Sequence, residues 1–238
     1  MINIKIIKKL VPSFVKSILM RVCYFLTWDP WIRYSYSQEG EDMVLRKIFK
    51  SQNNGFYVDV GAHHPKRFSN TYLLYKKGWK GINIDATPGS MKLFNKLRQR
   101  DINLELGVAG KETFLDYYIF NEPALNSFSM QLSEKRNEKN EFFIKEIIKV
   151  DVKPLSKILD IYLKGHKIDF LNIDVEGMDL DVLNSNDWSK YRPKFVVIEI
   201  LKNNLHEINK EPIFQLMKKQ NYVIFSKQIN TVFFKDSL

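Results

Sequence analysis

Two short apolar segments, each carrying an aspartate at its end, constrain the fold most. Residues 56–60 (FYVDV) and residues 81–85 (GINID) have the composition of buried strands, and Asp59 and Asp85 stand at their carboxyl ends. Between them, residues 69–77 have the pattern of a helix. A strand, a helix and a second strand of this size form half of a nucleotide-binding fold, so the segment predicts an α/β domain with a ligand at this edge.

The turn after the first strand predicts what kind of ligand this is. It opens with Gly61 and Ala62, and a glycine there lets the backbone approach a bound molecule closely. Free N–H groups at the start of the next helix favour polar or anionic groups, and an acid ending the second strand can accept both hydroxyls of a ribose. We therefore expect a ligand that contains a ribose.

The glycine pattern argues against a dinucleotide. A dinucleotide fingerprint needs three glycines because a pyrophosphate lies against the backbone, and here the three positions hold Gly61, His63 and Pro65. A ribose cofactor without phosphates demands less of the loop, and S-adenosylmethionine is such a cofactor. The alternative is a turn that merely needs a small residue after a buried strand.

Length and composition indicate one domain with a short extension. The 238 residues are 45% hydrophobic and 27% charged, which is ordinary for a globular protein. We expect a domain over residues 35–238. The single cysteine, Cys23, gives no disulfide framework, which suits a cytoplasmic protein. The net charge of +10 comes from lysines spread along the chain, so no nucleic-acid partner is expected.

Residues 1–34 form the predicted extension, which is basic and amphipathic. No apolar window is long enough without a charge to span a membrane, and the pattern is a poor match to a signal peptide. Residues 1–30 could lie on the inner face of a membrane or pack on the flank of the domain. The cationic residues among the first 21 are Lys5, Lys8, Lys9, Lys16 and Arg21.

The remaining chain alternates between helical and strand patterns. Five strands separated by helices and followed by a hairpin predict a doubly wound, mostly parallel sheet of seven strands with a C-terminal antiparallel hairpin. The expected strands are 56–60, 81–85, 102–109, 168–174, 194–200, 222–227 and 231–235. The expected helices are 37–50 with Ser37 as its cap, 69–77, one starting at Pro88, 154–163, 178–183 and 212–219.

A polar segment interrupts this alternation. Residues 121–141 lie between two strand-like stretches, 114–120 and 142–153, and have the composition of a surface loop or short helix. Segments of this kind beside an active site commonly cover the substrate. We therefore predict that residues 121–141 form a lid.

With these elements placed, the chain resembles the FkbM family of S-adenosylmethionine-dependent methyltransferases over residues 35–235. The resemblance implies the Rossmann-like sheet of class I methyltransferases and a cytoplasmic enzyme of polysaccharide biosynthesis. The motifs that carry it are YSQEGED at 36–42, VDVGAHHP at 58–65, SNT at 69–71, INIDATPGSM at 82–91, LGVAG at 106–110, DFLNIDVEG at 169–177 and VVIEI at 196–200.

The resemblance also implies a cofactor site. Asp59 and Gly61 would lie by the amino-acid part of S-adenosylmethionine, Asp85 would hold the ribose, and residues 107–109 would lie near the adenine. Gln38 and Glu41 would approach the methionine end. The expected cofactor-binding residues are Gln38, Glu41, Asp59, Gly61, Ala62, Asp85, Ala86, Gly107, Val108 and Asp174.

The chain departs from the family pattern in two places. His63 and Pro65 stand where the family commonly has an asparagine and a glycine. Asn172 stands where a lysine is common, which removes a positive charge from the site. Both departures concern the cofactor loop and its neighbour.

Carboxylates at the ends of later strands are the candidate catalytic groups. Methyl transfer to a hydroxyl needs a base, and we predict Asp174 as that base, with Glu176, Glu199 and His63 as further catalytic candidates. Alternatively, Asp174 could cap a helix beginning near Gly177, and Glu176 could be a favourable charge at its start.

Other groups give weaker signals. His63 and the adjacent His64 could cap a turn instead of acting in catalysis. Asp174, Glu176, Glu199 and His206 have no recognised metal spacing, so no metal site is predicted.

We therefore expect O-methylation of a hydroxyl on a small molecule or glycan, most specifically a sugar of a surface polysaccharide. The first alternative is a nucleic-acid methyltransferase or nucleic-acid-binding protein, which the net charge of +10 would favour. The second is a membrane-docked protein that binds S-adenosylmethionine without turnover.

Overall fold

The structure of the protein is a computed structural model that describes residues 12, 14–15, 31–138, 141–202 and 204–238. The chain divides into two units, Met1–Tyr34 and Ser35–Leu238. The predicted amphipathic extension falls mainly on residues outside the described ones, so it stays a prediction. The second unit carries the sheet and the candidate site.

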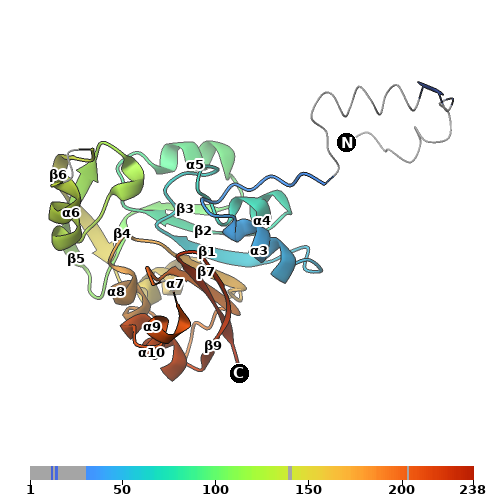
Figure 1. Cartoon of the computed structure of the whole chain (residues 1–238). Helices are drawn as coiled ribbons and strands as arrows, with labels where there is room; N and C mark the ends of the chain where they lie inside the picture. The colour runs from blue at the N-terminus through green and yellow to red at the C-terminus, as the bar shows by residue number, and fades with distance from the viewer. Residues whose placement is uncertain (1–11, 13, 16–30, 139–140, 203) are drawn as a thin grey trace. The chain divides into compact units, whose positions relative to one another are not determined.

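The larger unit is built on a seven-stranded sheet in the order β3-β2-β1-β7-β8-β10-β9 (Figure 1). The first five strands in this order are parallel, and β10 is antiparallel to both of its neighbours. This is the predicted doubly wound sheet with its C-terminal hairpin, so the expected fold class is confirmed. The strands are β1 (Phe56–Val60), β2 (Lys80–Asp85), β3 (Ile102–Glu105), β7 (Phe170–Ile173), β8 (Phe195–Glu199), β9 (Tyr222–Gln228) and β10 (Thr231–Asp236).

Helices cover both faces of this sheet, which explains why its central strands are apolar throughout. All five residues of β1 are buried; Tyr57 packs in a cluster with Leu45 and Leu74, whereas Val58 packs in a cluster with Leu159 and Val182. Neighbouring residues of one strand thus serve two cores. The helices are α3 (Glu41–Ile48), α4 (Tyr72–Lys76), α5 (Met91–Leu97), α7 (Leu155–Tyr162), α8 (Asp179–Asn184), α9 (Leu205–Ile208) and α10 (Pro212–Lys219).

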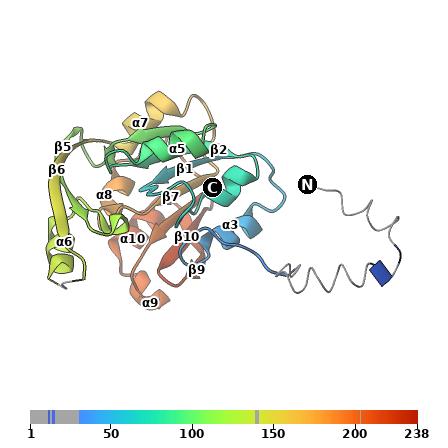
Figure 2. The same cartoon turned by 90° about the horizontal axis from the view of Figure 1, so that it is seen from above.

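A second, three-stranded sheet in the order β4-β6-β5 lies beside the large one (Figure 2). The polar segment between β5 and β6, which was expected to be a surface loop or a short helix, contains two short helices. The elements are β4 (Gly107–Val108), β5 (Thr113–Phe120), the 3₁₀ helix η1 (Pro123–Leu125), α6 (Met130–Asn137) and β6 (Ile144–Lys153).

The prediction of a single strand over 102–109 is wrong. Residues 102–105 pair with β2 in the large sheet, whereas Gly107 and Val108 pair with β6 in the small one. A Cβ atom on Gly107 would lie 2.5 Å from the ring of Phe128, so only glycine allows β4 to run this close to the segment that follows β5. The chain changes sheets at Leu106 to reach this position.

The first predicted helix also begins later than expected. Helix α3 starts at Glu41, and the residue before it is Gly40 with φ of 88°, so Ser37 is not its cap. Ser37 Oγ accepts a hydrogen bond from the backbone N–H of Asp42 at 3.1 Å and donates to the Asp42 carboxylate at 3.1 Å. Ser37 therefore fastens the loop that enters the helix.

Candidate functional site

Three small cavities lie along the edge of the sheet where the parallel strands end. The first, of about 50 Å³, is lined by Asp85, Gly107 and Tyr117 among others. The second, of about 60 Å³, includes Asp59, and the third, of about 50 Å³, includes Glu199. Asp174 lines all three cavities. The strand-end carboxylates predicted from the sequence are therefore brought together, with Asp174 at the centre.

Gly61 shapes the turn between the first and second cavities. It has φ of 81°, and a Cβ atom there would lie only 1.8 Å from the carbonyl oxygen of Asp174. The backbone N–H groups of Gly61 and Ala62 both donate to the carbonyl of Ile84, at 2.9 and 3.0 Å. From the sequence, we expected Gly61 to let a ligand approach the backbone closely. In the structure, the backbone that leaves β7 also occupies the space that a side chain at Gly61 would need.

Asp85 ends β2 at the wall of the first cavity. Its Oδ2 accepts the backbone N–H of His63 at 2.8 Å, and its Oδ1 accepts that of Thr87 at 2.8 Å. Two backbone donors hold the carboxylate, whose remaining lone pairs can accept ligand hydroxyls. Ala86, Gly107 and Val108, the other residues predicted for this part of the site, line the same cavity.

Asp59 lies at the bottom of the second cavity and is only 3% exposed. Its carboxylate accepts hydrogen bonds from Thr71 Oγ1 at 2.7 Å and Asn172 Nδ2 at 2.9 Å. Burial raises the pKa of Asp59, against these hydrogen bonds. Asn172, the departure from the family lysine, thus orients this carboxylate without a positive charge.

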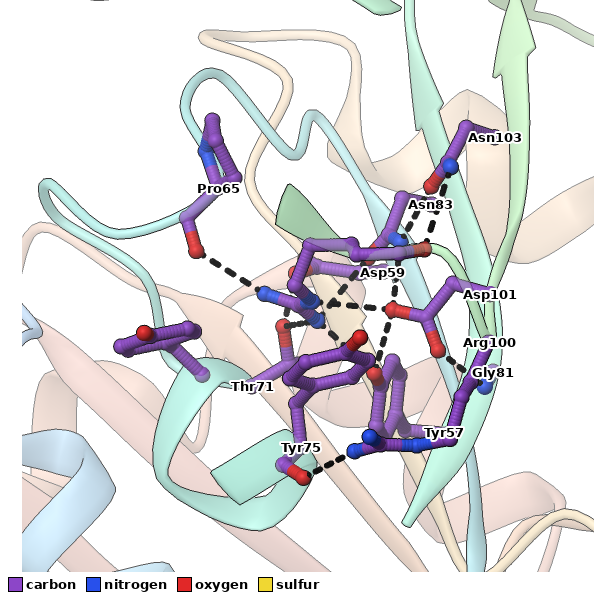
Figure 3. A network of polar contacts seen from close by, with 12 residues as sticks. Tyr57, Asp59, Pro65, Thr71, Tyr75, Gly81, Asn83, Arg100, Asp101 and Asn103 are labelled. Atoms are coloured by element: carbon purple, nitrogen blue, oxygen red, sulfur yellow. Dashed lines mark hydrogen bonds and ion pairs between the residues drawn. The ribbon is translucent and has the colours of Figure 1, made fainter. Parts of the chain in front are cut away.

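A buried polar network supports Asp59 from behind (Figure 3). Thr71 Oγ1, which donates to Asp59, accepts a hydrogen bond from Arg98 Nη2 at 3.0 Å. Arg98 Nε pairs with Asp101 at 2.9 Å, and both side chains are fully buried. Tyr57 Oη donates to Asp101 at 2.6 Å. The network was not predicted from the sequence, although a tyrosine in a strand expected to be buried was an available signal.

Asp174 is the predicted base, and its surroundings suit that role. Asp174 is exposed by accessible surface, although protein atoms pack around its carboxylate where it lines the cavities. Within residues 31–138, 141–202 and 204–238 no group donates a hydrogen bond to it. Desolvation, then the neighbouring carboxylates of Glu176, Asp179, Glu199 and Asp59, raise the pKa of Asp174 well above its usual value. A carboxyl with a raised pKa is a stronger base than an ordinary aspartate.

Glu199 faces the same space from the end of β8, opposite Thr231 of β10. Burial, followed by the charges of Glu176 and Asp179, raises the pKa of Glu199 to about 7. Glu199 can therefore exchange a proton near neutral pH, as a second acid or base at the third cavity.

Glu176 has a partner that the sequence did not reveal. Its Oε2 accepts a hydrogen bond from Arg136 Nη2 of α6 at 2.5 Å, and its backbone carbonyl accepts one from Ser127 Oγ at 2.7 Å. Arg136 also donates to the carbonyl of Leu125 at 3.0 Å. Glu176 thus ties α6 and the segment before it to the cleft, while its carboxylate lines the first and second cavities.

Among the described residues, Asp174 does not cap the following helix, and the alternative of Glu176 as a favourable charge at the helix start stays a prediction. Helix α8 begins at Asp179, and its N-cap residue, Met178, makes no side-chain capping bond. Instead, Asp179 accepts the backbone N–H groups of Val175 and Gly177, each at 3.2 Å, and so organises the loop that carries both acids. Burial raises the pKa of Asp179 to about 6.

The two histidines have different surroundings. His64 Nδ1 accepts the backbone N–H groups of Lys66 and Arg67 at 3.0 and 2.9 Å, so His64 caps a turn as expected. His63 lines the first and second cavities, has φ of 52° and keeps a buried Nε2 that has no hydrogen-bond partner among the described residues. Burial lowers the pKa of His63, so the imidazole is neutral at pH 7. A neutral ring can hydrogen-bond a ligand here.

Gln38 and Glu41 reach the site from the segment around the start of α3. Gln38 lines the second and third cavities, and Glu41, only 5% exposed, lines the third. Glu41 Oε1 accepts a hydrogen bond from Thr231 Oγ1 at 3.1 Å. The methionine-end positions that the family resemblance implied are therefore next to Asp174.

No cluster of three or more histidine, cysteine or acidic side chains suited to a metal ion occurs in the part of the chain that the structure describes. His206, which the sequence made a conceivable ligand, lies on α9 and lines none of the three cavities. The acids of the cleft have the chemistry of hydrogen-bonding and proton-accepting groups.

The three cavities are small compared with the roughly 300–1,000 Å³ of ordinary ligand pockets. His63 and Ala124 line both the first and the second cavity, and Phe68 lines the second and the third. Glu122, beside Ala124, pairs with Arg67 at 3.3 Å. A nucleotide-sized ligand therefore needs movement of these walls, which belong to the cofactor loop and the predicted lid.

Known proteins provide three comparisons with this chain. The model of a protein family described as "Methyltransferase FkbM domain" matches residues 59–224. A search of curated proteins finds no significant match. The solved structure titled "Crystal structure of small RNA methyltransferase HEN1" has 12% sequence identity and a TM-score of 0.40 over 87% of this chain. The chain spans only 27% of that protein, and a likeness of this degree carries no argument about substrate.

Proposed function

Because the chain belongs to the FkbM methyltransferase family, we propose that it methylates a hydroxyl group of a sugar or glycan with S-adenosylmethionine as methyl donor. The family implies this donor, which supplies an electrophilic methyl group when bound. The observation that carries the proposal is the Asp174 carboxylate, which is open to three adjoining cavities and has no hydrogen-bond donor in the described part of the chain.

The residues around the first two cavities fit this donor. Asp85 supplies a carboxylate fixed by two backbone N–H groups for the ribose hydroxyls, and Gly107 and Val108 leave a largely apolar wall for the adenine. Asp59 and Gln38 line the second cavity, where the amino-acid part would lie. The Nε2 of His63 is buried and has no hydrogen-bond partner in the described part of the chain, so movement of this wall would let it bond the ligand.

The third cavity fits a neutral, hydroxylated acceptor. Its lining is mostly polar, contains Asn70, Asn172 and Glu199, and includes no lysine or arginine among the described residues. Carboxylates and amides accept hydrogen bonds from hydroxyl groups, as a sugar requires. The same acids repel phosphates, so the cleft argues against the nucleic-acid alternative despite the positive charge of the whole chain.

Asp174 is the proposed base for the acceptor hydroxyl, with Glu199 near the same space. A base works best when its pKa lies near the working pH, and the pKa of Asp174 is raised while that of Glu199 is about 7. Bases of this kind contribute roughly 10²–10⁴-fold to rate. The lid predicted over residues 121–141 is proposed to exclude water, and the contact between Arg136 and Glu176 holds α6 within it.

The cellular setting follows from the proposed acceptor. No helix in the described ranges is long and apolar enough to cross a membrane. We propose a cytoplasmic enzyme of surface-polysaccharide synthesis whose residues 1–30 contact the inner face of a membrane through their cations and apolar side chains. A protein without turnover would bind S-adenosylmethionine but form no methylated product.

Calorimetric titration with S-adenosylmethionine, with NAD as comparison ligand, tests the cofactor part. Asp85→Asn should weaken binding about 10- to 100-fold, because hydrogen bonds to a charged group contribute roughly 1.5–3 kcal/mol. Asp116→Asn is the control, because Asp116 is exposed on β5 and pairs only with Lys149 in the described structure. Equal binding by all variants, or preference for NAD, would rule out this site.

Product formation tests the acceptor part. Neutral sugars and an oligonucleotide are offered with labelled methyl donor to the wild type and to Asp174→Asn. We expect methylation of a neutral sugar, reduced by about 100-fold or more in the variant when the methyl donor is saturating. Methylation of the oligonucleotide alone would contradict the proposed substrate class, and full activity of Asp174→Asn would remove Asp174 as the base.

A further inference from the structure

A groove of about 630 Å³ lies at the opposite edge of the large sheet from the cleft. Residues 163–168 precede β7 and residues 189–194 precede β8, and these two loops form its walls. Because β7 and β8 are parallel, the groove lies where both strands begin, whereas Asp174 and Glu199 lie where they end. The groove is therefore separate from the proposed methyl-transfer site.

The floor of this groove is apolar. Leu159, Leu163 and Ile168 line it and belong to the main core, with exposures of 2%, 6% and 4%. Tyr191 also lines it and is 7% exposed. The groove is thus a hollow over the edge of the core, and an apolar part of a ligand would find aliphatic contacts there.

Its rim is cationic. The positively charged residues that line it are Lys164, Lys167, Lys190, Arg192 and Lys194. Three of them have acidic partners, because Lys190 pairs with Asp160, Arg192 with Asp236 and Lys194 with Asp169. No carboxylate lies within ion-pair distance of Lys164 or Lys167 in the part of the chain that the structure describes, and both are exposed. The groove therefore keeps an excess of about two positive charges.

The loop that carries both lysines has a constrained backbone. Lys164 and Gly165 have φ values of 48° and 76°, a left-handed pair that is uncommon where the first residue is not glycine. The His166 ring stacks on Phe56 at the start of β1, with centroids 4.7 Å apart and planes 13° apart. The loop is thus fixed to the sheet, and its two cations stand at the mouth of the groove on a rigid support.

We propose that this groove binds the phosphate headgroup of an anionic phospholipid and docks the domain on a membrane surface. The cationic rim complements the phosphate, and the aliphatic floor complements the apolar region beneath a headgroup. Ile161, in the last turn of α7 just before the loop that carries Lys164, is 59% exposed and adds apolar surface to this part of the chain. Single-stranded nucleic acid would need exposed aromatic rings on which its bases stack. Apart from His166, the only aromatic side chain among the described residues of the lining is Tyr191, which is buried.

Vesicle flotation of the full chain tests the proposal. The vesicles are phosphatidylcholine with or without phosphatidylglycerol, and the variant is Lys164→Gln with Lys167→Gln. A lysine near an anionic surface contributes about 1 kcal/mol, or about fivefold in partitioning, so the double variant should bind about 30-fold less well. The control is Lys111→Gln with Lys145→Gln, which changes the net charge equally at two exposed positions, one between β4 and β5 and one on β6, and should stay within about twofold of the wild type.

Residues 1–34 are present in every variant, so their contribution to binding is the same throughout. An equal loss in both double variants would mean that only total charge matters and would overturn the proposal. So would unchanged binding in the Lys164 and Lys167 variant. Calorimetry with glycerol phosphate separates the sources of phosphate: saturable binding of the free compound without groove-dependent flotation would also overturn the membrane assignment.

Discussion

Replacing Asp101 with asparagine tests the buried network behind the cofactor loop most directly. The Asp101 carboxylate accepts hydrogen bonds from Arg98 Nε at 2.9 Å, Tyr57 Oη at 2.6 Å, Asn83 Nδ2 at 2.9 Å and the Gly81 N–H at 3.0 Å. Asp101→Asn keeps the shape of the side chain but removes its charge and turns one acceptor into a donor. The buried guanidinium of Arg98 then has no carboxylate partner.

The expected cost is large because Arg98 cannot shed its charge. Neighbouring Tyr57 and Asp101 raise the pKa of Arg98 in spite of its burial, so the guanidinium stays protonated. Two charges about 4 Å apart interact by roughly 4 kcal/mol at an effective dielectric constant of about 20. Breaking a buried pair by removing one partner costs about 3–5 kcal/mol, and we expect Asp101→Asn to lower the free energy of unfolding by that amount.

Urea unfolding followed by circular dichroism measures this loss. Asp116→Asn is the matched control, because it breaks an exposed ion pair with Lys149. The side chain of Lys149 is 65% exposed and that of Asp116 is 49% exposed. Exposed pairs contribute about 0–1 kcal/mol, so the control should change stability by less than about 1 kcal/mol. If both variants lose the same free energy, the assignment of a buried, uncompensated charge at Arg98 is refuted.

Three further outcomes are expected. Gly61→Ala should lower the melting temperature and abolish binding of S-adenosylmethionine, because the new Cβ would lie 1.8 Å from a backbone oxygen. Gly110→Ala is the control and should leave both unchanged, because no atom of the described residues lies within 4 Å of a Cβ there. The folded-state pKa of Glu199 is raised from 4.5 to about 7, so Glu199 favours folding at low pH and this contribution is lost as the pH rises from 4.5 to 7. The free energy of unfolding of Glu199→Gln, relative to that of the wild type, should therefore rise by about 1 kcal/mol between pH 4 and pH 8, after allowance for solvent screening. Urea unfolding at the two pH values measures this difference, and a fall instead of a rise would contradict the prediction. Arg136→Gln should speed hydrogen exchange in α6 about tenfold without affecting β1, and equal protection in both proteins would show that Arg136 does not hold α6 in place.

Much of the architecture could be predicted because it depends on local patterns. The apolar runs at 56–60 and 168–174 are typical of strands covered on both faces, and helical segments between such strands imply parallel neighbours. The break at Leu106 could not be predicted in the same way. Gly107 pairs with β6 in the small sheet, where the ring of Phe128, from a segment beyond β5, occupies the space that a side chain would need.

The candidate site shows the same division. Asp59, Asp85 and Asp174 could be predicted because each stands where a parallel strand ends, and such ends share one edge of the sheet. Arg98 and Arg136 could not, because each acts through a partner that the fold brings near. In sequence they are two of many basic residues on helical segments, and nothing local distinguishes them from solvated ones.

Periodicity and residue type were enough to predict most of the strands and helices, the small residue at Gly61 and the acids at the strand ends. The tertiary structure alone decided which acids share one space and what their proton affinities are. Protein atoms packed around Asp174 and Glu199 displace part of their water and other carboxylates lie nearby, so both pKa values are raised, although Asp174 keeps an exposed surface. Desolvation and charge proximity are properties of three-dimensional packing, so no segment of the chain contains them on its own.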